Sequence, residues 1–445
     1  MKFRVLFIVA GAALLGEATS APPGICDCSS IRATYLECRN TGKISIESLD
    51  KWPCQTELHS LQVMDFRGNF LDSLSFINIE LPSLEQLLFF ENKLAIVDLK
   101  VNLVGLKILN LGFNLFSATF NVEVLNQKTP NLQVFTLSRN QITGFHGDFE
   151  LASMYCLDLT GNNLTSVTFL NGGTFNALEQ LDLDENQLTA FDTTTVFPSL
   201  DDLNLAANIL TAVDFGQLSI QAPRLEDLDL SYNHISQVRN LETANLPFLN
   251  GIELEGNILE DIPGLASANL PSLEFLTLFE NLLTNVDFFD KGKFASVTDL
   301  DLRLNGIRNL EGMVNCHFYS LERLDIANNP LPNIDVLSRA DMPSIEDISL
   351  SSDTLKGSSC AASNFFNTLI ENTGQCRTLT YFKTGDEWEA LDRKICDSTC
   401  DMSSKDLSGA AIAGIVIGSV AALGLLIGIA YCFLTGKVTG EAVIV

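Results

Sequence analysis

The sequence predicts an α/β-type solenoid of about thirteen stacked repeats, preceded by a secretory signal and followed by one membrane-spanning helix. Three observations support this prediction. A pattern of leucines with one asparagine recurs every 22 to 26 residues through the middle of the chain, and an uncharged apolar segment lies near each end. The mean hydropathy of +0.21 is also high for a chain without membrane or targeting segments.

Residues 1–20 have the order of a secretory signal peptide. Two basic residues are followed by an uncharged run from Val5 to Leu15 and by the small-x-small sequence Ala18-Thr19-Ser20. The alternative, a retained anchor, is disfavoured because the run is too short to cross about 30 Å of hydrocarbon. We therefore expect a mature chain that begins near Ala21 and folds in an oxidising compartment.

Residues 409–434 form an uncharged run that is long enough to span a bilayer as a helix with some tilt. With a cleaved signal, the bulk of the chain lies outside, residues 435–445 form a short cytoplasmic tail, and the protein is a single-pass type I membrane protein. A lipid-anchor signal is the alternative, although Lys437 and Glu441 after the run argue against it. Small residues on one helix face predict lateral helix association through Gly414, Gly418, Gly424 and Gly428.

The repeated unit is clearest between Leu178 and Asn186, where leucine occupies positions 1, 4 and 6 and asparagine occupies position 9. Leucines at these positions predict a short strand with one apolar row, which stacked neighbours bury together. The asparagine should face inward and satisfy backbone groups of adjacent turns. Asp353 takes its place in a thirteenth copy; the others are Asn69, Asn92, Asn114, Asn140, Asn162, Asn186, Asn208, Asn233, Asn257, Asn281, Asn305 and Asn329.

This pattern resembles the leucine-rich repeat family over residues 58–357. The resemblance implies a leucine-rich repeat horseshoe of about 13 repeats, with a concave parallel sheet and Cys-containing N- and C-terminal caps. The N-terminal cap would occupy residues 21–57, and the C-terminal cap with a juxtamembrane stalk residues 358–408. Each group of four cysteines permits three disulfide pairings, and the sequence does not choose among them. The cap cysteines are Cys26, Cys28, Cys38 and Cys54, and Cys360, Cys376, Cys396 and Cys400.

Two further cysteines lie inside the repeats, Cys156 in the fifth copy and Cys316 in the eleventh. Six repeats separate them by about 30 Å, which is beyond disulfide reach, so they should not pair with each other. Each is either a small buried apolar residue or the site of an intermolecular disulfide. Phe169, Phe215 and Phe288 each lie seven residues past the ladder asparagine and are expected to pack on the convex side.

No enzymatic constellation is present in the sequence. The four histidines are scattered without metal-ligand spacing, and no nucleophile elbow, phosphate-binding loop or kinase motif occurs. We therefore expect no catalysis, no cofactor and no metal site. A net charge of −28 also excludes nucleic acid as a partner attracted by the protein's field.

Positions 2, 3, 5, 7 and 8 of each copy should point to solvent on the concave face. In copies six to nine these positions carry many acids and no lysine or arginine. A concave surface of one sign attracts an oppositely charged partner, so a basic protein or peptide ligand is expected here; solvated surface and divalent cations are the alternatives. The predicted acidic patch is Glu179, Asp182, Asp184, Asp202, Asp227, Asp229, Glu253 and Glu255.

Apolar residues at concave positions are more unusual, because this face has no structural need for them. Clustered aromatic residues there are typical of binding hot spots. The alternative is that the N-terminal cap folds over the first group. The predicted apolar patch is Leu88, Phe90, Ile108 and Phe113 in copies two and three, and Phe275 and Phe279 in copy ten.

Asn163 lies in the only Asn-x-Ser/Thr sequence and is expected to be glycosylated. The arrangement as a whole is similar to single-pass leucine-rich repeat receptor-like proteins without a cytoplasmic kinase domain. That resemblance implies recognition of a protein or peptide ligand and signalling through a membrane co-receptor. The alternatives are an adhesion or matrix-organising protein that sends no signal, and a capture or inhibitor protein.

Overall fold

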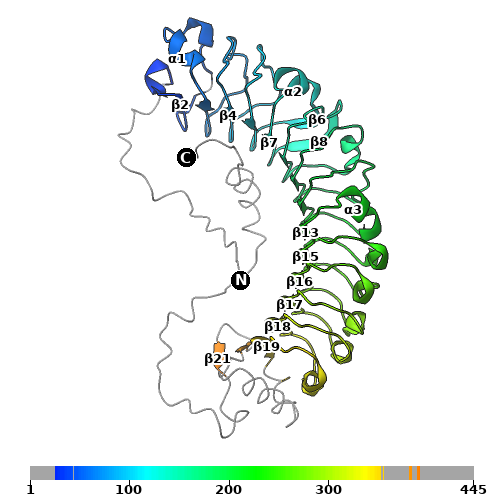
Figure 1. Cartoon of the computed structure of the whole chain (residues 1–445). Coiled ribbons are helices and arrows are strands. Elements are labelled where there is room, and N and C mark those ends of the chain that lie inside the picture. The colour runs from blue at the N-terminus through cyan, green and yellow to red at the C-terminus, as the bar shows by residue number, and fades with distance from the viewer. Residues whose placement is uncertain (1–25, 44, 352–353, 355–379, 383–387, 391–445) are drawn as a thin grey trace. The chain divides into compact units, whose positions relative to one another are not determined.

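The computed structural model describes residues 26–43, 45–351, 354, 380–382 and 388–390 (Figure 1). Within these residues, no helix is long and apolar enough to cross a membrane. The predicted signal peptide, the 409–434 helix with its glycines, the cytoplasmic tail and the cysteines of the C-terminal cap lie outside them. The chain divides into two compact units, an N-terminal unit that ends at Gln187 and a C-terminal unit that begins at Leu188.

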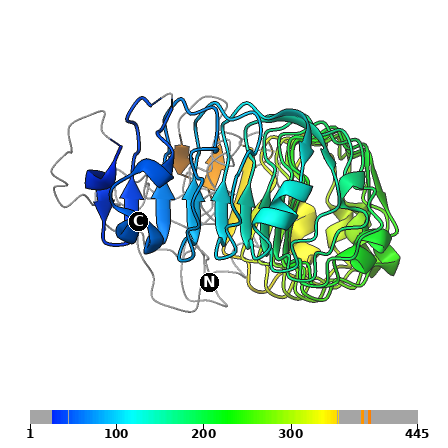
Figure 2. The same ribbon diagram turned by 90° about the horizontal axis from the view of Figure 1, so that it is seen from above.

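The N-terminal unit is a stack of short strands, one for each repeat, because each copy places its apolar positions 4 and 6 inward. Figure 2 shows these strands side by side, and they pair in parallel register from β2 onward, whereas β1 and β2 are antiparallel. A second, two-stranded parallel sheet joins β6 to β8. The strands are β1 (Ile31–Arg32), β2 (Tyr35–Glu37), β3 (Val63–Asp65), β4 (Gln86–Leu88), β5 (Ile108–Asn110), β6 (Ser117–Asn121), β7 (Val134–Thr136), β8 (Gln141–His146), β9 (Cys156–Asp158) and β10 (Gln180–Asp182).

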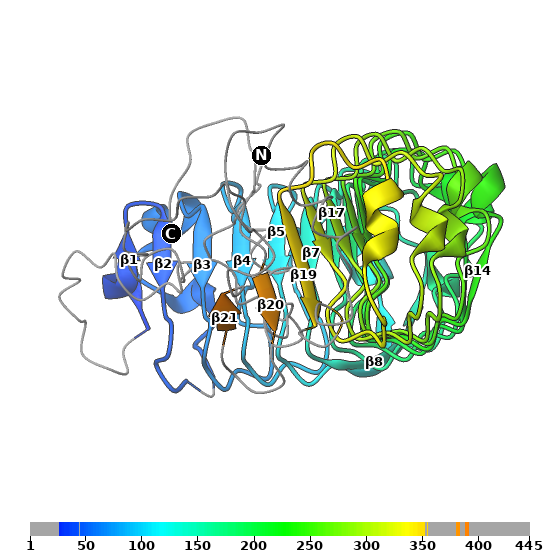
Figure 3. The ribbon, with the colours of Figure 1, turned by 90° about the horizontal axis from the view of Figure 1, so that it is seen from below.

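The C-terminal unit repeats this arrangement, with parallel strands from β11 to β20 and an antiparallel pair formed by β20 and β21. A small parallel sheet joins β12 to β14. Figure 3 shows β17 and β19 of this unit from below. The strands are β11 (Asp202–Asn204), β12 (Ala212–Asp214), β13 (Asp227–Asp229), β14 (Gln237–Arg239), β15 (Gly251–Glu253), β16 (Phe275–Thr277), β17 (Asp299–Asp301), β18 (Arg323–Asp325), β19 (Asp347–Ser351), β20 (Thr380–Phe382) and β21 (Trp388–Ala390).

Short helices return the chain on the side opposite the strands. Large side chains pack beneath them: Phe215 and Phe288 are buried, and the Phe169 ring lies 4.5 Å from that of Phe145. The predicted packing of these phenylalanines is confirmed. The helices are α1 (Gln55–His59), α2 (Glu123–Lys128) and α3 (Phe215–Gln221), with 3-10 turns η1 (Cys28–Ser30), η2 (Leu49–Lys51), η3 (Thr168–Leu170), η4 (Leu241–Thr243), η5 (Leu265–Ser267), η6 (Asp287–Phe289), η7 (Glu311–Met313) and η8 (Asp335–Arg339).

The asparagine at position 9 links each repeat to the one before it. The Nδ2 of Asn92 donates to the carbonyl of Phe66 in the preceding repeat at 2.9 Å and to that of Phe89 in its own repeat at 3.1 Å. Its Oδ1 accepts from the Leu71 amide at 3.0 Å. The predicted ladder is confirmed, since the same pattern recurs at Asn114, Asn140, Asn162, Asn186, Asn233, Asn257, Asn281, Asn305 and Asn329.

The residue at position 8 adopts the left-handed conformation in all twelve copies that carry the asparagine. Only Gly68, Gly161 and Gly256 are glycines, and there a neighbouring side chain also approaches closely. A Cβ on Gly161 would lie 2.8 Å from Cδ of Arg139, and one on Gly256 would lie 2.6 Å from Cδ1 of Tyr232. The other nine copies have a residue with a Cβ at this position, for which the left-handed conformation is sterically unfavourable. They are Glu91, Phe113, Arg139, Glu185, Ala207, Tyr232, Glu280, Leu304 and Asn328.

Two disulfides close the N-terminal cap, Cys26–Cys38 and Cys28–Cys54, which selects one of the three pairings that the sequence left open. Cys316 is free and buried, as expected for a small apolar residue. Cys156 is buried as well but is disulfide-bonded, so neither reading proposed for it from the sequence suffices. Because Cys316 is free, the prediction that these two cysteines do not pair with each other is confirmed.

Candidate functional site

Carboxylates gather on the strands of copies seven to nine in the C-terminal unit. Parallel register places Asp202 of β11 beside Asp227 of β13, and Asp229 of β13 beside Glu253 of β15. Neighbouring strands are about 4.8 Å apart, so these like charges lie close together. With Glu255, two residues past Glu253, they form what we call the acidic strip: Asp202, Asp227, Asp229, Glu253 and Glu255.

The acidic strip carries raised pKa values. Burial, followed by the neighbouring carboxylates of Asp227, Asp201 and Asp229, raises the pKa of Asp202 to about 7. Burial also raises the pKa of Glu255 to about 7, although the Thr277 hydroxyl donates to its carboxylate. The same causes raise the pKa of Glu253 well above its ordinary value. Ionising these carboxyl groups therefore costs free energy unless a cation lies close to them.

No lysine or arginine of the described chain forms an ion pair with Asp202, Asp229, Glu253 or Glu255. Within the same residues, no group of His, Cys, Asp and Glu is arranged to hold a metal ion. Asp202, Asp229 and Glu253 thus have no ion-pair partner among the described lysines and arginines, whereas the Arg303 guanidinium interacts electrostatically with Glu255.

Position 5 has a structural duty that the sequence analysis missed. Oδ1 of Asp229 accepts the backbone N–H of Ser231 at 2.9 Å, which fixes the turn after the strand. The sequence did carry a signal, because position 5 holds Asp in some copies and Asn in others, such as Asn204, and both side chains offer an accepting Oδ1. The same bond recurs in seven copies, from Asp65, Asn110, Asp158, Asn204, Asp229, Asp301 and Asp325.

The expectation that the acidic positions face solvent is confirmed for Asp227 and Glu253, which are exposed, but is wrong for three other residues. Asp182, Asp184 and Glu255 are only 6–7% exposed. One reason is hydrogen bonding between copies, because the Thr160 hydroxyl donates to Asp184 at 2.6 Å and that of Thr277 to Glu255. Three members of the predicted patch belong to the N-terminal unit: Glu179, Asp182 and Asp184.

The next three copies of the C-terminal unit carry acids too, but with arginines beside them. Arg303 lies at position 7 of copy eleven and donates from Nε to Asp301 at 2.9 Å, with Asp325 of the next strand at 3.3 Å. Arg323, at position 3 of copy twelve, pairs with Asp299. We call Asp299, Asp301 and Asp325 the arginine-paired acids.

The predicted apolar patch is divided between the two units. In the N-terminal unit the rings of Phe90 and Phe113 lie 4.8 Å apart, and Phe113 is 42% exposed, so the N-terminal cap does not cover it. Leu88, by contrast, is buried, and Ile108 packs against the buried Val134 and Cys156. In the C-terminal unit, Phe275 is 38% exposed, whereas Phe279 lies 5.1 Å from the guanidinium of Arg303.

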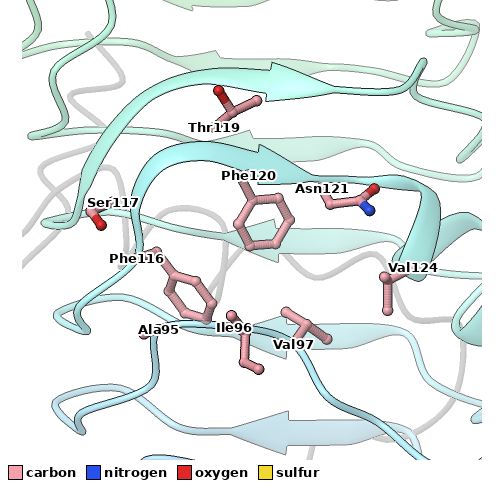
Figure 4. A pocket seen from close by; sticks show the side chains of 9 residues that line it. All are labelled: Ala95, Ile96, Val97, Phe116, Ser117, Thr119, Phe120, Asn121 and Val124. Carbon is pink, nitrogen blue, oxygen red and sulfur yellow. The ribbon is translucent and has the colours of Figure 1, made fainter.

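A hollow of about 250 Å³ in the N-terminal unit also escaped the sequence analysis (Figure 4). Phe116 and Phe120 line it together with Ile96, Val97 and Val124. The 26-residue spacing between Asn114 and Asn140, the longest in the chain, was the available signal, because this longer copy forms β6. The sequon residue Asn163 is exposed, as glycosylation requires.

Comparisons with known proteins identify the class of fold. No family model and no curated protein matches the chain. Among solved structures, the leucine-rich repeat domain of APL1B is 20% identical with a TM-score of 0.55, covering 80% of this chain and 89% of that one. An internalin, inlF from Listeria monocytogenes, is 20% identical with a TM-score of 0.54, covering 71% and 86%. The plant peptide hormone receptor RGFR1 in complex with RGF2 is 21% identical with a TM-score of 0.50, covering 74% and 52%.

These likenesses, the parallel register of the repeats and the asparagine ladder all indicate the same fold. The chain has the leucine-rich repeat fold.

Proposed function

We propose that the chain is a cell-surface recognition protein whose acidic strip binds basic side chains of a protein or peptide ligand. The carrying observation is the stack of carboxylates on adjacent strands, in which Asp202, Asp229 and Glu253 form no ion pair with a lysine or arginine of the described chain. A ligand cation would supply the missing counter-charge and lower the raised pKa values on binding. The fold is consistent with this role, since solenoid strands form extended binding surfaces, and RGFR1 is a receptor for a peptide hormone.

The proposed location is the cell membrane, with residues 1–20 as a cleaved signal peptide and residues 409–434 as a single spanning helix. The ligand-binding units would then be extracellular, and signalling would require a membrane co-receptor. A lipid anchor in place of the helix is the alternative. Cross-linking the full-length chain on its own cells distinguishes the roles: a captured membrane kinase supports the receptor, and capture of only matrix or opposing-cell proteins supports adhesion.

The binding role is tested by placing an arginine inside the acidic strip. Ser231 occupies position 7 of copy eight, between Asp229 and Glu253, as Arg303 lies between Asp301 and Asp325. Ser231→Arg should therefore neutralise the strip internally. We expect the full-length chain to lose affinity for a labelled (Ser-Arg-Gly)₅ peptide by about tenfold or more, measured by fluorescence anisotropy against a detergent blank.

Ser236→Arg is the matched control, because it adds the same charge at an exposed position outside the concave strands. It should weaken peptide binding by less than about twofold. Wild-type affinity in Ser231→Arg, or an equal loss in both variants, would contradict binding at the acidic strip.

A further inference from the structure

The turn that follows each concave strand carries an exposed residue at position 10, directly after the ladder asparagine. In the C-terminal unit this position holds Ile209, Ile258 and Leu282, which are 43%, 44% and 51% exposed. His234 lies between the first two and is also exposed. We call Ile209, Ile258 and Leu282 the edge ridge.

The fold does not require apolar side chains at this position. In the N-terminal unit this position holds exposed Phe70 and Leu115 in copies one and three, but the copies between and after them carry the exposed polar residues Lys93, Gln141, Asn163 and Gln187, so no two adjacent copies are apolar. Asn163 is the sequon residue, so position 10 there accepts even a glycan attachment site. Three aliphatic residues within four consecutive copies of the C-terminal unit therefore need another explanation, and exposed apolar rows are typical of protein contacts.

The edge ridge is a fixed feature. The backbone N–H of Ile209 donates to Leu188 O at 3.1 Å, that of Ile258 to Ile235 O at 3.1 Å, and that of Leu282 to Leu259 O at 2.9 Å. Each bond joins position 10 to the preceding repeat, so the backbone that carries these side chains is held in line at the repeat spacing. Such preorganisation lowers the entropy cost of binding.

The edge ridge borders the acidic strip. Tyr232, at position 8 of copy eight, lies over the backbone of Gly256 in copy nine. Its backbone N–H donates to the carbonyl of Glu255 at 2.8 Å, which places Tyr232 beside the acidic strip. Position 8 stands between strip positions 3 to 7 and ridge position 10, so Tyr232 joins an acidic surface to an apolar one.

We propose that the edge ridge and the acidic strip together dock a basic amphipathic helix of a partner protein, a proposal that rests on the function proposed above. The apolar face of the helix would lie on the ridge, and its arginine or lysine side chains would reach the strip. Strand spacing is about 4.8 Å, and apolar residues on one helix face recur every 3.5 residues, or about 5.2 Å. In an extended peptide, alternate residues lie about 6.7 Å apart, so successive side chains would not match the spacing of the ridge residues.

The test uses two labelled peptides of identical composition. The first is an eighteen-residue helix of Leu, Ala and Arg, with the leucines on one face and the arginines on its flank. The second contains the same residues, rearranged so that the leucines surround the helix. Binding to the purified full-length chain is measured by anisotropy against a detergent blank, for wild type and for the triple variant Ile209→Ser, Ile258→Ser, Leu282→Ser.

The triple variant should bind the amphipathic peptide at least about tenfold more weakly while its affinity for the rearranged peptide stays unchanged. The matched control replaces three exposed apolar residues elsewhere in the same unit by serine, Val196, Ile220 and Phe248, and should bind like wild type. All six positions are exposed, and an unchanged unfolding temperature verifies that the variants fold.

Equal affinity for the two peptides, unaffected by the triple variant, would overturn the ridge and leave the acidic strip in place. Failure of both peptides to bind wild type would overturn the proposed function as well.

Discussion

Copies seven to nine and copies ten to twelve of the C-terminal unit have the same backbone conformation but differ in how their acidic residues are paired. Both place acids at position 5, Asp229 and Glu253 in the first set and Asp301 and Asp325 in the second. Only the second set has arginines at concave positions, Arg303 among them. The repeat thus fixes the position of each carboxylate. The residue types at positions 3 and 7 determine whether the counter-charge comes from the protein itself or from a ligand.

Protons can replace the missing arginines, which predicts the largest effect. The pKa of Asp202 rises from 3.8 to about 7 in the folded chain, and that of Glu255 from 4.5 to about 7. Between pH 4 and 7 the folded state therefore binds more protons than the unfolded state, and stability falls as the pH rises through this window. These two carboxyls alone should lower the free energy of unfolding by about 5 kcal/mol between pH 5 and pH 8.

The measurement is denaturant unfolding of wild type and of Asp202→Asn, Glu255→Gln across that range. The double variant should lose the part of the slope that Asp202 and Glu255 contribute and keep the part from Glu253 and Asp325, whose pKa values are also raised. Asp192→Asn, Glu260→Gln, which makes the same changes at exposed positions, should keep it. A wild-type slope in the first variant would show that these two carboxyls do not carry the pH dependence.

Removing an arginine should make the second set resemble the first. Arg303→Met leaves Asp301 and Asp325 side by side without a cation, and the pKa of Asp325 is already about 7 from burial and from Asp301. The side chains are about a quarter exposed, so the loss should be smaller than for a fully buried pair, at about 2 kcal/mol at pH 8. Thermal unfolding measures it.

A second substitution makes this result specific. Arg303→Met, Asp325→Asn should recover most of the lost stability, because the repulsion is gone. Arg308→Met, at an exposed arginine in the same copy, should change stability by less than about 0.5 kcal/mol. If Arg303→Met proves as harmless as this control, the arginine does not compensate the acids.

Sequence reasoning predicted the features that repeat exactly and missed those that depend on register between copies. The asparagine ladder could be predicted because Asn92 and its counterparts recur at one position, and a buried amide needs partners. The pairing of Arg303 with Asp325 needed the strand register, because the two residues are 22 positions apart. The edge ridge was missed for the same reason, since a lone Ile258 in a loop looks ordinary until Ile209 and Leu282 are aligned with it.

The left-handed turns were hidden for a different reason. Glycine is the usual signal for positive φ, and only three of twelve copies have it at position 8. The hydrogen bonds of the ladder on one side and of position 10 on the other fix the turn whatever residue occupies it. The backbone conformation at position 8 is set by hydrogen bonds to neighbouring repeats, so the residue type at this position does not predict it.

The smallest predicted effect tests whether the two sets truly share a backbone. Ala207 in copy seven has φ 49° and Leu304 in copy eleven has φ 52°. Glycine relieves the steric cost of this conformation, partly offset by its greater entropy when unfolded. Ala207→Gly and Leu304→Gly should therefore each stabilise the chain by roughly 0.5 kcal/mol, which chemical denaturation resolves.

Ala268→Gly is the control, because Ala268 has φ −63° and gains nothing from glycine. It should destabilise by about 0.5–1 kcal/mol. Equal gains at Ala207 and Leu304 would mean that the turn is equally strained in both sets, so that their difference lies in charge alone. A gain at only one site would mean that the backbones differ, and the contrast between the acidic strip and the arginine-paired acids would then need a structural explanation as well as an electrostatic one.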